Sequence, residues 1–134
     1  MEWGIKTFEN DDAYDWLLDL EESNDLSLLV DAFEKDNSDY IETPEGSNIL
    51  AAAEIVLGLI GNARSGLPEQ AQAWIVKYKS KLEADGLKEK AIIAIDKVLS
   101  KDSALNELWS GTEGDYQVWL SDVKQLKSEI ENCS

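Results

Sequence analysis

Residues 44–62 are the longest segment of the chain in which apolar residues would surround a helix on every side. At 3.6 residues per turn its large aliphatic residues leave no polar face, which is typical of a helix enclosed by other helices. Thr43 as the N-cap and Pro44 at the first helical position mark its start. We therefore expect a central buried helix, whose large aliphatic residues are Ile49, Leu50, Ile55, Val56, Leu57, Leu59 and Ile60.

Apolar residues recur at helical spacing through the rest of the chain, and no long stretch alternates with a period of two. The apolar stripes cover residues 13–20, 26–33, 71–82, 87–99, 105–109 and 116–130. Asp102 or Ser103 is placed to cap the short sixth helix, and Thr112 followed by Asp115 approximates a capping box for the last. We expect residues 1–134 to form a single all-α domain, a compact bundle of six or seven helices.

The charge of the chain is strongly negative and unevenly distributed. The formal net charge is −16, and residues 1–60 hold sixteen acidic residues against only Lys6 and Lys35. This charge argues against nucleic acid and against an anionic membrane surface as partners, because both would repel it. A half of the chain that carries mainly negative charge can instead steer a basic protein toward itself, or simply keep the chain soluble. The oligomeric state stays open.

The residue types present argue against most catalytic mechanisms. The chain has no histidine, and its one cysteine, Cys133, is the second-to-last residue of the sequence. Catalytic arrangements that need histidine are therefore impossible, no disulfide can form within the chain, and zinc loses its preferred ligands. The sequence shows no glycine-rich phosphate loop, no secretory signal and no apolar stretch long enough to span a membrane. We expect a cytoplasmic protein without a cofactor and without a catalytic site.

Four acidic residues fall on one stripe of the first helix at spacings of three, four and three: Asp12, Asp15, Asp19 and Glu22. Like charges at these spacings repel by roughly 0.2–0.5 kcal/mol per pair. Solvent screening, the helix dipole, a divalent cation or a basic partner could offset this cost. Calcium normally takes its oxygens from a turning loop, which a straight helix does not provide. A solvated acidic face is the simplest interpretation.

Glu54 is the one charged residue between Ile49 and Ile60 of the central helix. A buried lone carboxylate is costly unless it is hydrogen-bonded. A structural interpretation has Glu54 accept hydrogen bonds from indole or backbone N–H groups and hold Trp3 or Trp16 in place, since a buried indole N–H needs an acceptor. A functional alternative makes Glu54 a perturbed acid in a pocket.

The N-terminal stretch WGIKTFENDDAYDW resembles the opening motif of a family of small, mostly bacterial proteins, the domain of unknown function 4259. The resemblance continues through AAAEIV (51–56), LPEQAQAWI (67–75, with Trp74) and SALNELW (103–109, with Trp109). Ile5 and Lys6 depart from the family, which often has a small residue and glycine there. The residues that match the opening motif are Trp3, Gly4, Phe8, Glu9, Asn10, Asp11, Ala13, Asp15 and Trp16.

The resemblance implies a compact soluble domain and supplies no catalytic residues. It also groups the N-terminal segment with Glu54 as one structural unit. The leading hypothesis is a non-enzymatic acidic interaction protein, of the kind that an immunity or inhibitor protein represents, covering a basic partner surface. The alternative is a domain that binds a small molecule or divalent cation through Glu54 or the stripe of Asp12, Asp15 and Asp19. An enzyme that uses carboxylates alone ranks last.

Overall fold

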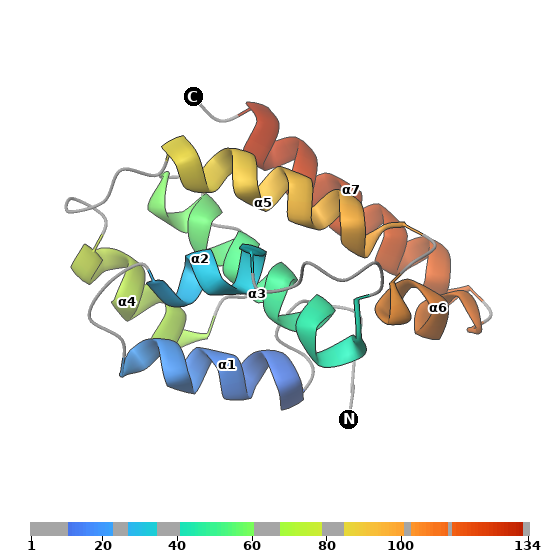
Figure 1. Ribbon diagram of the computed structural model, residues 1–134, viewed down its shortest axis with the longest axis horizontal. Coiled ribbons are helices and arrows are strands. Elements are labelled where there is room, and N and C mark those ends of the chain that lie inside the picture. Colours follow the sequence, from blue (N-terminus) through green and yellow to red (C-terminus); the bar gives the residue numbers. More distant parts are fainter. Residues whose placement is uncertain are drawn as a thin grey trace.

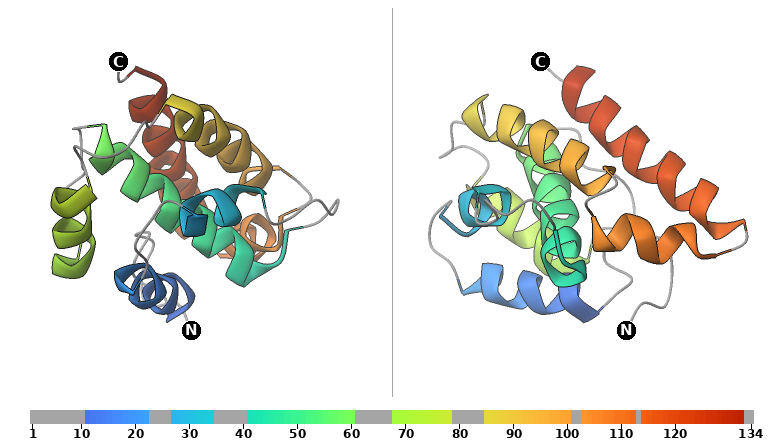
Figure 2. Two further views of the ribbon diagram at one scale, coloured as in Figure 1. Left: turned by 60° about the vertical axis from the view of Figure 1, so that its left-hand side comes forward. Right: turned by 45° about the vertical axis from the view of Figure 1, so that its right-hand side comes forward.

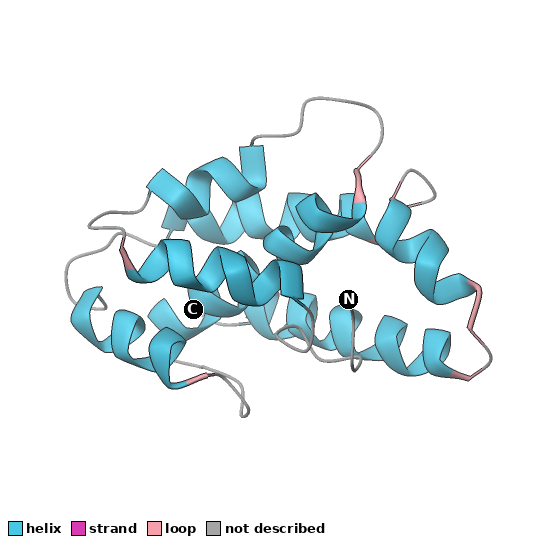
Figure 3. Ribbon diagram, turned by 90° about the horizontal axis from the view of Figure 1, so that it is seen from below, coloured by secondary structure: helices cyan, strands magenta, loops and turns pink. Residues whose placement is uncertain are grey.

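The computed structural model of the protein describes residues 11–22, 27–34, 41–60, 68–78, 85–100, 103–112 and 114–132. In these ranges all of the regular structure is helical (Figure 3). The only extended pairing among them is an isolated parallel bridge between Ile41 and Ser103. The predicted all-α fold is thus confirmed. The seven helices are α1 (Asp11–Glu21), α2 (Ser27–Glu34), α3 (Thr43–Leu59), α4 (Glu69–Tyr78), α5 (Asp85–Val98), α6 (Ala104–Ser110) and α7 (Asp115–Asn132).

Helix α3 is the centre of the bundle, as its apolar pattern predicts. It packs against each of the other six helices. Every residue from Ile49 to Leu59 is buried. Helices α1 and α4 lie on one side of α3, while α5 and α7 lie on the other (Figures 1 and 2). Because α3 has no polar face, only this central position removes all of its apolar surface from water.

One face of α3 joins α1, α2 and α4 in a hydrophobic cluster that we call the N-terminal cluster. Helix α1 contributes residues at the spacing of a single helical stripe, and Trp74 and Ile75 of α4 belong to the same cluster. A polar contact ties the same two helices together, since Gln70 Nε2 donates to the Tyr14 hydroxyl at 2.9 Å. The α1 stripe consists of Ala13, Trp16, Leu17 and Leu20.

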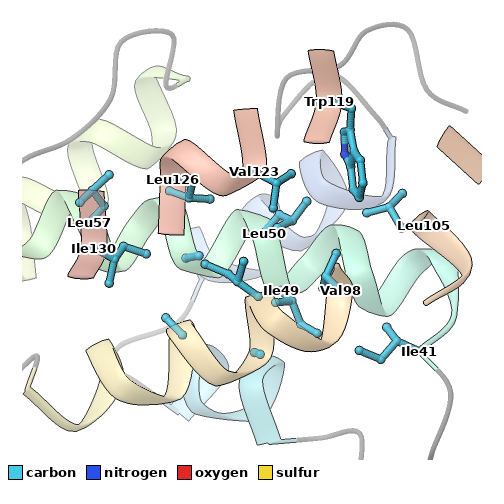
Figure 4. Close-up of a cluster of buried hydrophobic side chains, with 14 of the residues drawn as sticks. Ile41, Ile49, Leu50, Leu57, Val98, Leu105, Trp119, Val123, Leu126 and Ile130 are labelled. Carbon is cyan, nitrogen blue, oxygen red and sulfur yellow. The ribbon is translucent and has the colours of Figure 1, made fainter. Parts of the chain in front are cut away.

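The opposite face of α3 joins α5, α6 and α7 in a second, C-terminal cluster. Figure 4 shows Val123, Leu126 and Ile130 of α7 lying along α3 beside Leu50 and Leu57. The indole rings of Trp109 and Trp119 stack with centroids 6.3 Å apart, which joins α6 to α7. Burial of each large aliphatic side chain contributes about 1.5–3 kcal/mol, so the two clusters supply most of the driving force for folding.

The start of α6 is held by a small polar network that the sequence does not reveal. Ser103 is fully buried and, as predicted, caps α6, with Oγ accepting from the Asn106 N–H at 3.2 Å. The side chain of Asn106 donates to the Ser100 carbonyl at 3.1 Å and accepts from the Tyr116 hydroxyl at 3.0 Å. The Ala104 N–H donates to the Ile41 carbonyl at 2.7 Å. These bonds join α5, α6, α7 and the residues before α3.

Two predicted N-caps and one predicted helix end differ from the structure. Helix α3 ends at Leu59, with Ile60 as its C-cap, and not at residue 62. Thr43 is the first residue of α3, and Glu42 takes the N-cap position with no side-chain hydrogen bond. Thr112 does not cap α7. Its hydroxyl donates to the Trp109 carbonyl at 2.7 Å, because the last carbonyls of a helix have no N–H donor within the helix itself. No described helix has the length and apolar character needed to cross a membrane.

Candidate functional site

The outward face of α1 is the most strongly charged surface of one sign among the described helices. Asp15, Asp19 and Glu22 are exposed, and they follow the helical repeat on the side opposite the buried stripe. Leu18 lies among them and keeps 44% of its surface exposed. We call Asp15, Leu18, Asp19 and Glu22 the α1 face.

Helix electrostatics do not explain the acids of the α1 face. No basic residue occurs in the last turn of α1. Asp19, Glu21 and Glu22 instead lie at the C-terminal end, where the helix dipole is negative and each carboxylate is unfavourable by about 0.3–1 kcal/mol. Asp15 and Asp19 add repulsion at a spacing of four residues. The distribution of charge therefore lowers the stability of α1. Any group that stabilises these carboxylates must come from outside the helix.

The carboxylates of the α1 face are spread along the helix. Among the described residues, no three acidic or thiol side chains converge closely enough to hold a metal ion. The cause is geometric, because a straight helix rises about 1.5 Å per residue and spreads successive carboxylates along its length. Asp12 belongs to α1, but its side chain lies outside the described part of the structure.

Glu54 lies in the middle of α3, and its side chain is buried, with 4% of its surface exposed. It takes part in a polar or electrostatic interaction. Ser47 lies two turns before it on the same side of α3, is 1% exposed, and its Oγ has no hydrogen-bond partner among the described residues. Neither residue belongs to the two hydrophobic clusters. On the helical repeat both positions lie at one boundary between the α3 residues of the N-terminal cluster and those of the C-terminal cluster.

The burial of Glu54 bears on its role. A carboxylate that is 4% exposed offers almost no surface to a ligand in solution, so a substrate could reach it only if the core opened. Burying a charged carboxylate without compensation costs several kcal/mol, so any group that compensates Glu54 stabilises the fold. These observations favour the structural interpretation of Glu54 over an acid in an open pocket.

The motif residues of the sequence fall into three groups. Trp16 and Trp74 lie in the N-terminal cluster and Trp109 in the C-terminal cluster, each at most 8% exposed. Asp15 is exposed on the α1 face. Several others are outside the described residues, or have side chains that are: Trp3, Gly4, Phe8, Asn10 and Asp11.

Two residues with distinctive surroundings escape the sequence patterns. Asn106 occupies the centre of the polar network at α6, yet an asparagine inside a predicted helix gives no sign of that role. Ile93 lies in α5 with 66% of its surface exposed, although its neighbours Ala91, Ala94 and Ile95 are buried. The signal for Ile93 is its position off the buried stripe of its own helix.

Comparison with known proteins gives one match. The model of the family described as Domain of unknown function (DUF4259) matches residues 2–122, which is most of the chain. No curated protein and no solved structure matches.

Proposed function

Because the chain belongs to the DUF4259 family, whose description assigns no activity, its role has to be inferred from its own surface, and we propose that it is a non-enzymatic interaction module. In this proposal the α1 face binds a basic surface of another protein. Such binding fits the role of an immunity or inhibitor protein, which covers a functional basic surface of its target.

The placement of carboxylates at the C-terminal end of α1 is the observation that carries the proposal. Asp19, Glu21 and Glu22 are exposed there without a basic residue in the last turn. Their repulsion from each other and from the helix dipole would be relieved by lysine or arginine side chains of a partner. The exposed Leu18 would give such a partner an apolar contact within the charged rim.

Association of this kind depends strongly on ionic strength. The screening length is about 10 Å at 0.1 M salt, so exposed charges attract a partner over a long distance only when salt is low. Complementary charge raises the association rate more than it slows dissociation. A partner captured through the α1 face should therefore be lost as salt is raised.

The experiment is capture from native lysate of the source cells at low salt, followed by elution with a salt gradient. The test variant is Asp15→Asn/Asp19→Asn, which removes two charges from the α1 face. The matched control is Asp115→Asn/Glu131→Gln, which removes two exposed charges from α7. We expect the wild type and the control to retain the same basic protein, and the test variant to release it at lower salt. Equal retention by both variants would refute a role for the α1 face.

A further inference from the structure

No further inference is drawn: the strongest candidate, the outward side of α5 where Ile93 is exposed between an acidic strip (Glu89 and Asp96) and a basic strip (Lys90 and Lys97), carries none, because nothing in the described part of the structure shows what covers it.

Discussion

A single added carbon at Gly46 tests whether the first turn of α3 is fixed against α6. Gly46 is buried in α3, and a Cβ atom there would lie 3.3 Å from Leu105 Cβ and 3.4 Å from Leu105 Cδ2. Favourable carbon contacts are about 3.5–4.0 Å long. Leu105 Cβ is attached directly to the backbone of α6, so α6 itself would have to move. The bridge between Ile41 and Ser103 opposes that movement.

Two effects of opposite sign determine the result for Gly46→Ala. Alanine is the better helix former by about 1 kcal/mol. Overpacking a core contact costs about 1–3 kcal/mol, and the upper part of this range applies where the neighbour is held in place. We expect Gly46→Ala to destabilise the fold by about 1 kcal/mol. Gly46→Val adds two further methyl groups at the same contact and should cost about 3 kcal/mol or more.

Urea unfolding followed by circular dichroism gives the free energies, and thermal unfolding should show about 3–5 °C per kcal/mol for a chain of this size. The matched control is Gly111→Ala at the C-cap of α6, where φ is −81° and a Cβ would meet its nearest atom, the Leu108 carbonyl oxygen, at an ordinary 3.6 Å. The control should change stability by less than about 0.5 kcal/mol. A Gly46→Ala variant more stable than the wild type would contradict the reasoning, because it would mean that α6 moves away freely.

Four further results are expected. Glu54→Gln should destabilise the fold by about 2–3 kcal/mol in urea unfolding. If the carboxylate of Glu54 accepts a hydrogen bond from the Trp3 indole, a double-mutant cycle with Trp3→Phe should show a coupling energy of about 1 kcal/mol; additive effects would exclude that hydrogen bond. Asn106→Ala should cost about 2–3 kcal/mol, because it removes two side-chain bonds and leaves the Tyr116 hydroxyl without its acceptor; a cost below about 0.5 kcal/mol would show that water replaces the network. The bond to Asp96 raises the pKa of Lys127 above 10.5, so this bond stabilises the fold below pH 10.5 and is lost as pH rises through the higher pKa of the folded state. Lys127→Met should therefore be less stable than the wild type by under about 1 kcal/mol at pH 8. At the alkaline end of the titration the two proteins should be equally stable. Calcium, magnesium or manganese should leave the melting temperature unchanged, whereas a rise that grows with metal concentration would favour the cation-binding alternative.

The central helix was predictable because its signal is local and redundant. Seven large aliphatic residues on every face of one segment leave a helix no stable position except the interior. The all-α class follows from the same kind of periodicity in the other helices. The cap at Ser103 was also predictable, because a serine before a short apolar helix needs only its own turn to make the bond.

Other features depend on which elements meet in space, and local patterns do not carry that information. Thr112 has the spacing of a capping box, yet its hydroxyl donates to the Trp109 carbonyl at the end of α6. Asn106 is important because the end of α5 and the start of α7 both lie beside it. Ile93 lies off the apolar stripe of its own helix, but only the packing of α5 shows how much of its side chain faces solvent. The composition of the α1 face, in contrast, was visible in the sequence.

The position of α3 between two clusters has a consequence during synthesis on the ribosome. Helices α1 and α2 precede α3 in the chain, whereas α5, α6 and α7 follow it. When α3 has emerged, its second face, with Leu50 and Leu57, still lacks the helices that bury it. Partly made chains with exposed apolar surface are prone to aggregate and are held by chaperones. The nascent chain should therefore need such protection until α7 has left the exit tunnel.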